Sequence, residues 1–239
     1  MEKFIVGNWK MNLGDDEGLD LLKNLSQLKV ESHTTCIVSP PFTILKSAQK
    51  ILENSSIFLG AQDCAAEEKG AFTGEISPYM LKMAGCTSVI VGHSERRKHH
   101  GETSDIVRRK AEKASLFGLL PIICVGETLA EYEAQKTLSI LKSQVEESVP
   151  HKDVPFLLAY EPVWSIGTGK VPKIEEIEHT CAFIANLFES IPPILYGGSV
   201  SPDNVKSILK SSHVNGVLVG GASLNFEQFK KIINNVTQI

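Results

Sequence analysis

Short apolar runs alternate with longer segments of helical periodicity along the whole chain. Eight runs are expected to form strands, at residues 4–7, 35–39, 57–61, 88–92, 119–125, 156–160, 193–196 and 216–219. A segment that can be helical follows each of them, at residues 16–28, 42–52, 78–84, 104–117, 129–147, 174–188, 202–209 and 226–234. In residues 174–188 apolar side chains recur at spacings of three and four, which predicts a helix with one buried face. The pattern therefore predicts eight consecutive βα units.

The expected strands are continuous apolar runs, without alternation of polar and apolar residues. Such runs are typical of parallel strands that crossover helices cover on both faces. Eight units favour an α/β fold in which residues 1–239 form a single-domain (β/α)8 barrel. An open doubly wound sheet is the alternative, but no GxGxxG motif follows the first strand and no linker or shift in composition marks a second domain.

Composition indicates which partners and which cellular compartment to expect. The net charge of -4 and the apolar fraction of 42% give no reason to expect a nucleic-acid or membrane partner. The N-terminus lacks the apolar core of a signal peptide, and no apolar run approaches the roughly 20 residues of a membrane span. Five widely spaced cysteines without a CxxC pair are typical of free thiols in a reducing compartment. We expect a cytoplasmic protein.

Residues that could bind a substrate or take part in catalysis follow the carboxyl ends of five of the expected strands. They are Asn8 and Lys10, the run His93, Ser94 and Glu95, then Glu161, the segment Gly197 to Ser199, and the pair Gly220 and Gly221. In a (β/α)8 barrel these strand ends form one mouth, so residues far apart in the sequence are expected to converge there.

The segment FLLAYEPVWSIGTGK, residues 156–170, joins a buried strand to a carboxylate and then to a loop. Glu161 ends the apolar run, where a charge needs a partner or water, and Pro162 stops the strand. The turn from Gly167 to Gly169 marks a surface loop, yet Trp164 and Ile166 beside it are bulky and apolar. The pattern indicates a lid over a catalytic carboxylate, although a glutamate after a strand is more often a surface charge.

Two glycine-rich turns, YGGSV at residues 196–200 and VGGAS at 219–223, indicate a phosphate site. Glycine lets backbone N–H groups approach an anion closely, and these turns follow the last two strands, where barrels commonly bind phosphate. Lys10 would add a fixed positive charge. The N-terminus of a short helix after His93 would disfavour protonation of the imidazole. Tight turns, a solvated lysine and a structural histidine remain the alternatives.

Metal chemistry is not indicated by the spacing of possible ligands. No HExxH or comparable motif occurs, and the pair His99 and His100 is more typical of solvated side chains. We expect no metal and no cofactor.

Seven segments together resemble the triosephosphate isomerase family, in its order and at its approximate spacings: NWKMN, GAFTGEIS, VGHSERR, CVGE, AYEPVWSIGTGK, YGGSV and LVGGASL. The resemblance runs from Gly7 to Leu224. It implies a TIM barrel that interconverts dihydroxyacetone phosphate and D-glyceraldehyde 3-phosphate in glycolysis and gluconeogenesis. The implied reaction is a cofactor-free proton transfer through an enediolate.

The resemblance also implies a role for individual residues. Glu161 would be the base, His93 the neutral electrophile, Lys10 an electrostatic stabiliser and Asn8 a substrate contact. The backbone amides of Gly167, Ser199, Gly220 and Gly221 would hold the phosphate. Ser94 and Glu95 would support the site, with Glu95 paired to Lys10.

Two apolar residues are expected to complete the closed lid. Ile166 on the lid and Leu218 on the last strand would press near Glu161, so that the carboxylate loses water and becomes more basic. Ser165, Val171 and Pro172 depart from residues frequent in the family, which leaves the lid kinetics open.

The segment from Asp63 to Ser77 is long for a βα loop, and long ordered loops are usually functional. The resemblance implies that it docks into a second subunit, with Thr73 near the partner's site. We therefore expect a homodimer.

Other functions remain open at this point. Another phosphate-binding barrel, such as a pentose-phosphate epimerase or an indole-glycerol-phosphate synthase, is the alternative among enzymes. A non-catalytic barrel that only binds phosphorylated ligands or acts as a scaffold is the alternative outside them, although it would not need Lys10, His93 and Glu161.

Overall fold

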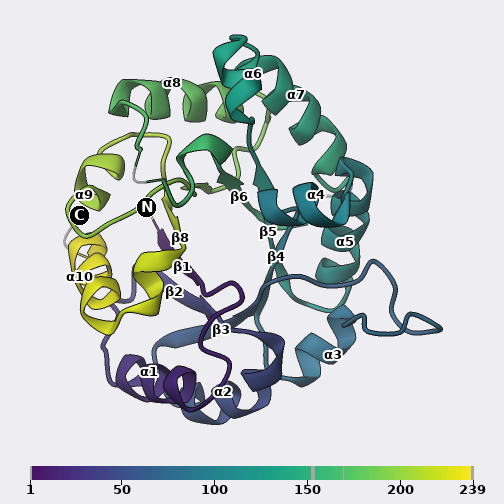
Figure 1. The fold of residues 1–239 in the computed structure, drawn as a ribbon, viewed down its shortest axis with the longest axis vertical. Helices are drawn as coiled ribbons and strands as arrows, with labels where there is room; N and C mark the ends of the chain where they lie inside the picture. The colour runs from purple at the N-terminus through teal and green to yellow at the C-terminus, as the bar shows by residue number, and fades with distance from the viewer. Residues whose placement is uncertain (1, 152–153, 169, 238–239) are drawn as a thin grey trace.

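The computed structural model describes residues 2–151, 154–168 and 170–237. Within them eight parallel strands close into one barrel in sequence order, with the last strand paired to the first (Figure 1). The strands are β1 (Lys3–Asn8), β2 (Thr34–Ser39), β3 (Ile57–Ala61), β4 (Ser88–Val91), β5 (Leu120–Val125), β6 (Leu157–Tyr160), β7 (Ile194–Tyr196) and β8 (Gly216–Val219). The predicted (β/α)8 barrel is confirmed, and the strand ends differ from the prediction by at most one residue.

Helices form a ring around this barrel (Figure 1). They are α1 (Asp16–Ser26), α2 (Leu45–Leu52), α3 (Pro78–Met83), α4 (Ser94–His100), α5 (Ser104–Leu116), α6 (Leu129–Glu133), α7 (Thr137–Ser148), α8 (Ile174–Ala185), α9 (Val205–Ile208) and α10 (Phe226–Thr237). Short 3₁₀ turns are η1 (Phe42–Ile44), η2 (Val163–Ser165) and η3 (Gly221–Leu224). No helix in the described ranges is both long and apolar enough to cross a bilayer.

Two predicted helices are wrong in detail. Residues 129–147 form two helices, because Gln135 adopts a left-handed backbone conformation with φ of 56° that ends α6 before α7 begins. Residues 202–209 are helical only over α9. There the Asn204 side chain accepts the N–H of Ser201 and donates to the carbonyl of Ser199, so local side-chain bonds replace the start of the helical ladder.

Most strand side chains are buried, on both faces of the barrel wall, and Phe58 on β3 is an exposed exception. Phe4 and Val6 of β1 belong to the cluster that fills the barrel, whereas Ile5 between them belongs to the larger core between strands and helices. The two-sided burial is the reason why the strands are continuous apolar runs in the sequence.

The same alternation brings side chains to the mouth of the barrel. Asn8 follows Phe4 and Val6 at a spacing of two, and Glu161 follows Leu157 and Ala159 in the same way. Because side chains of a strand point alternately to its two faces, both polar residues continue the inward rows. The strand register therefore positions them.

Gly60→Ala tests the packing inside the barrel wall. A Cβ at Gly60 would lie 2.6 Å from Oγ of Ser39 and 2.8 Å from Cγ2 of Ile37, so we expect a loss of about 1–3 kcal/mol in the free energy of unfolding in urea. Gly14→Ala is the control, since its nearest neighbour, Oγ1 of Thr43, would be 3.8 Å from the new Cβ. Equal stability of the two variants would contradict the packing described.

Candidate active site

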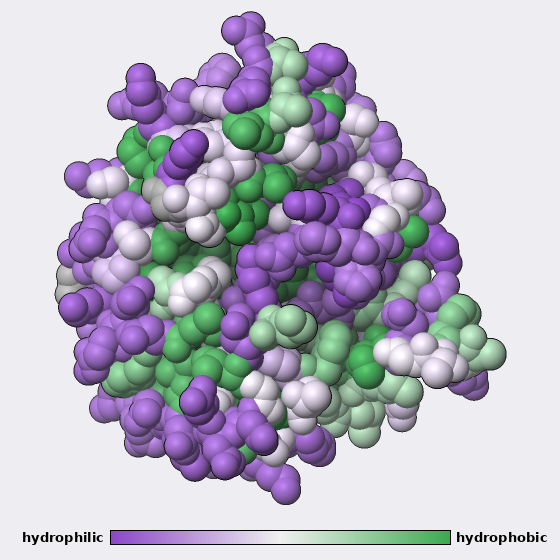
Figure 2. All heavy atoms as spheres, in the orientation of Figure 1, coloured by the Kyte–Doolittle hydropathy of each residue, from purple (hydrophilic) through white to green (hydrophobic). Residues whose placement is uncertain are grey.

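A cavity of about 420 Å³ opens at the carboxyl ends of the strands. Figure 2 shows apolar side chains gathered in a hollow on this face, with hydrophilic residues around it. The predicted site residues that line the cavity are Asn8, Lys10, His93, Glu161, Ile166, Gly167, Ser199, Leu218, Gly220 and Gly221. Ser94 and Glu95 contact this set through hydrogen bonds from outside the lining. Gly169 of the expected lid turn lies outside the described residues.

Glu161 is almost completely buried, with 1% of its surface exposed. Its Oε2 accepts a hydrogen bond from the backbone N–H of Ser94 at 3.1 Å. Its Oε1 lies 3.2 Å from Nε2 of His93, but the two atoms are not aligned as a hydrogen bond, so this oxygen has no hydrogen-bond partner within the described part of the chain. A buried carboxylate oxygen without a partner can accept a hydrogen bond from a molecule bound in the cavity.

His93 is oriented by the start of α4. It is the N-cap residue, and its Nδ1 accepts the backbone N–H of Glu95 at 3.2 Å. An Nδ1 that accepts a hydrogen bond carries no hydrogen, so the neutral ring has its hydrogen on Nε2, the atom that faces Glu161. The preceding Gly92 has φ of 69°, and a Cβ there would lie 2.6 Å from Val107, so only glycine fits the turn that leads into His93.

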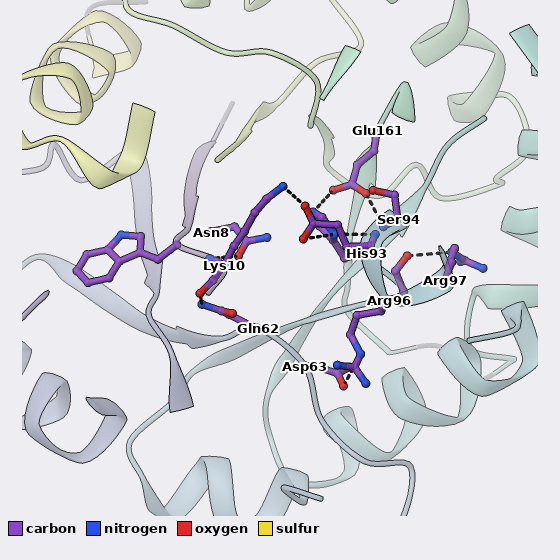
Figure 3. A network of polar contacts seen from close by, with 12 residues as sticks. Asn8, Lys10, Gln62, Asp63, His93, Ser94, Arg96, Arg97 and Glu161 are labelled. Atoms are coloured by element: carbon purple, nitrogen blue, oxygen red, sulfur yellow. Dashed lines mark hydrogen bonds and ion pairs between the residues drawn. The ribbon is translucent and has the colours of Figure 1, made fainter. Parts of the chain in front are cut away.

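Lys10 supplies a fixed cation beside the imidazole and the carboxylate (Figure 3). Its Nζ pairs with Oε1 of Glu95 at 2.5 Å, as the sequence predicted. Burial opposes ionisation of Glu95, but the hydrogen bond from Lys10 and the positive charges nearby together outweigh it, and the pKa of Glu95 is below its ordinary value. The backbone of Lys10 is left-handed, with φ of 54°, and is held by Oδ1 of Asn8 and Nε2 of Gln62. A strained backbone fixed in this way is typical of functional sites.

The glycine-rich turn after β8 leaves room for an anion. A Cβ on Gly221 would meet no atom within 4 Å, and one on Gly220 would meet only Cε of Lys10, at 3.7 Å. Gly221 also begins η3, and the start of this helical turn lines the cavity together with Lys10. Ser199, after β7, lines the same cavity.

The segment after β6, which the sequence analysis expects to be a lid, is anchored by an aromatic residue. Nε1 of Trp164 donates to Oε1 of Glu127 at 2.8 Å, and its ring lies 4.4 Å from the ring of Tyr132. Burial raises the pKa of Glu127. Ile166 and Gly167 follow and line the cavity, and Gly167 has φ of 68°.

An ionic cluster that the sequence analysis did not predict fixes α4 to the barrel. Arg96 contacts Asp63 at 2.8 Å and Glu102 at 2.5 Å, and Lys110 contacts the same two carboxylates. Burial raises the pKa of Asp63 to about 6. Burial is also the largest single effect on Glu102, but the hydrogen bonds and charges of Lys110 and Arg96 together outweigh it and lower the pKa of Glu102.

Sequence reasoning missed several polar residues of the site, among them the three described next. Asn12 and Asn204 line the cavity, and Gln62 holds the carbonyl of Lys10. Asn12 belongs to the segment NWKMN and could have been chosen from it, whereas nothing in the spacing singled out the other two. Among the described residues, no group of three or more His, Cys, Asp and Glu side chains is arranged to hold a metal ion.

Comparison with known proteins gives a consistent result. The family model described as triosephosphate isomerase matches residues 3–236. The triosephosphate isomerase of Thermoanaerobacter pseudethanolicus is 41% identical over 242 residues, which cover 96% of this chain and 98% of the relative. That of Mycoplasmopsis pulmonis is 44% identical over 237 residues, which cover 96% of each chain. The crystal structure of triosephosphate isomerase from Bartonella henselae superposes with a TM-score of 0.91 at 38% identity, over 100% of both chains.

Ser94→Pro tests the bond that holds Glu161. Proline is favoured at the first position of a helix, and His93 already has φ of -51° and ψ of 142°, which suits a residue before proline. The substitution therefore removes the N–H with little effect on α4. We expect a loss of about 1–3 kcal/mol in the free energy of unfolding, since a buried carboxylate loses its donor.

Ser94→Ala is the matched control, because it keeps the backbone N–H and should unfold like the wild type. If the N–H contributed nothing, the proline variant would be as stable as the wild type or slightly more stable.

Proposed function

Because the chain belongs to the triosephosphate isomerase family, we propose that it interconverts dihydroxyacetone phosphate and D-glyceraldehyde 3-phosphate by proton transfer through an enediolate. The observation that carries the proposal is the meeting of a carboxylate, a neutral imidazole and an ammonium group at one cavity with a glycine-rich cradle. Residues 1–239 would act as one catalytic domain, in the cytoplasm, within glycolysis and gluconeogenesis. No cofactor or metal is required for the steps below.

Glu161 would move the proton between the two adjacent carbons of the substrate, since one base can reach both. The hydrogen on Nε2 of His93 would stabilise the oxygen that becomes negative, and Lys10 would stabilise the same charge through space. Asn8 would contact the substrate. Enzymes lower barriers by roughly 8–23 kcal/mol, whereas a positioned base contributes about 10²- to 10⁴-fold in rate and one oxyanion donor about 3–4 kcal/mol. The groups must therefore act together.

Binding of the phosphate would supply the remaining stabilisation. The backbone amides of Gly167, Ser199, Gly220 and Gly221 would hold it, and closure of the lid would use its binding energy. Ile166 and Leu218, which line the cavity beside Glu161, would exclude water from the carboxylate and from the enediolate.

The segment from Asp63 to Ser77 would form the contact to a second copy of the chain. It extends away from the barrel between β3 and α3, at the right of Figure 1. Phe72 in it is 47% exposed, and Met11 on the loop after β1 is 96% exposed. Large apolar side chains exposed in this way favour a covering partner. Thr73, exposed beside Phe72, would then lie near the partner's cavity.

Glu161→Asp tests the catalytic base. The shorter side chain withdraws the carboxylate by one methylene group, and a misplacement of about 1 Å can lower a rate 10²-fold. In a coupled assay that starts from glyceraldehyde 3-phosphate, we expect rapid wild-type turnover, unchanged by a chelator, and a decrease of about 10²-fold or more in the variant.

A variant as active as the wild type would exclude Glu161 as the base, and loss of wild-type activity with chelator would contradict the metal-free mechanism.

Leu218→Ala in the same assay tests whether the Leu218 side chain excludes water from Glu161. An unchanged pH–rate profile would argue against a role of Leu218 in desolvating the carboxylate.

Sedimentation velocity tests the dimer. We expect the wild type to sediment with twice the mass of one chain, and Phe72→Asp to shift toward the monomer because a charge enters an apolar contact. Phe58→Asp is the matched control, since Phe58 on β3 is also 47% exposed but lies outside the segment from Asp63 to Ser77. An active wild-type monomer would refute the proposed assembly.

A further inference from the structure

Ser165, at the start of the lid, is completely buried and its hydroxyl makes several contacts. Oγ donates to the carbonyl of Lys170 at 2.5 Å and accepts the backbone N–H of Ser199 at 3.2 Å. The hydroxyl of Tyr196 lies 3.4 Å away. One side chain therefore connects the two ends of the lid to each other and to the turn after β7.

Ser199 is bound to Ser165 through both of its donors. Its N–H reaches Oγ of Ser165, and its own hydroxyl donates to the backbone carbonyl of Ser165 at 2.6 Å. Ser199 is also one of the residues that line the cavity, where its amide would hold the phosphate of the substrate. In the structure, the N–H of Ser199 therefore already donates a hydrogen bond to a side chain of the lid.

The close approach of lid and turn depends on Gly198. A Cβ at this position would lie 2.2 Å from the hydroxyl of Tyr196 and 2.9 Å from Oγ of Ser165. A larger residue would push the two segments apart. The contact is therefore a feature of the fold around the cavity, with glycine at the position that the hydroxyls of Tyr196 and Ser165 approach.

We infer that the Ser165 hydroxyl is an internal occupant of the phosphate cradle, which the phosphate of the substrate displaces from the amide of Ser199 when it binds. This inference rests on the proposed function, because it uses the phosphate-binding role of Ser199. One N–H serves one acceptor well, so the hydroxyl and a phosphate oxygen compete for it. Ser165 acts as a positioning residue that stabilises the ligand-free lid, and the phosphate must overcome this stabilisation.

The direction of the effect separates this role from a merely structural one. If Ser165 only held the lid in shape, its loss would weaken phosphate binding or leave it unchanged. If its hydroxyl competes with phosphate, Ser165→Ala removes the competitor and phosphate binds more tightly. The dissociation constant of phosphate is expected to decrease about 2- to 12-fold, the factor that corresponds to one net hydrogen bond.

The experiment is a calorimetric titration of inorganic phosphate into the wild type, Ser165→Ala and Ser139→Ala. Ser139 is the matched control, because its hydroxyl also donates to a lysine carbonyl, that of Lys136, on an exposed part of α7. We expect Ser165→Ala to bind phosphate about 2- to 12-fold more tightly and Ser139→Ala to bind like the wild type. Unchanged or weaker binding by Ser165→Ala, or an equal gain in the control, would overturn the inference.

The isomerase assay on the wild type separates the two proposals. An inactive wild type would refute the proposed function whatever the titration gives. An active wild type whose phosphate affinity does not increase on Ser165→Ala would leave the isomerase intact and refute the competing role of the hydroxyl.

Discussion

A carboxylate removed from water needs a donor, and the backbone N–H of Ser94 supplies one to Glu161. That N–H is available because it lies in the first turn of α4, where no carbonyl of the helix can accept it. The start of α4 also fixes the ring of His93 through the N–H of Glu95, and the side chain of Glu95 fixes Lys10. One helix end therefore orients the carboxylate, the imidazole and the ammonium group.

The position of α4 in turn depends on ion pairs with its neighbours. The cluster of Arg96, Asp63, Glu102 and Lys110 joins the helix to the loop after β3 and to α5. Removing one charge of such a buried cluster leaves the others unpaired, so its members support one another. On the opposite side of the cavity the lid and the turn after β7 are joined by Ser165 and Ser199. The first contact is ionic, whereas the second consists of neutral hydrogen bonds, which are weaker than charge-assisted ones.

Prediction from sequence succeeded where a local rule decides the outcome. The position of Glu161 at the mouth follows from an apolar run that forms a strand and ends at a carboxylate, and both features are visible in residues 156–161. The break at Gln135 was missed, because a left-handed residue other than glycine leaves no signal in the apolar periodicity. The role of Ser165 could not be found either, since its partner Ser199 is 34 positions away and the bond exists only when two loops meet.

The sequence by itself determined the eight βα units and the rim at which Asn8, Lys10, His93, Glu161 and the two glycine-rich turns would gather. It did so because strand periodicity and the direction of parallel strands are properties of short segments. Only the tertiary structure decided the tautomer of His93, the donor to Glu161, the ionic cluster behind α4 and the occupation of the Ser199 amide. Each of these depends on the distance and angle between groups from different segments, to within a few tenths of an ångström, and such geometry arises only when the barrel has closed.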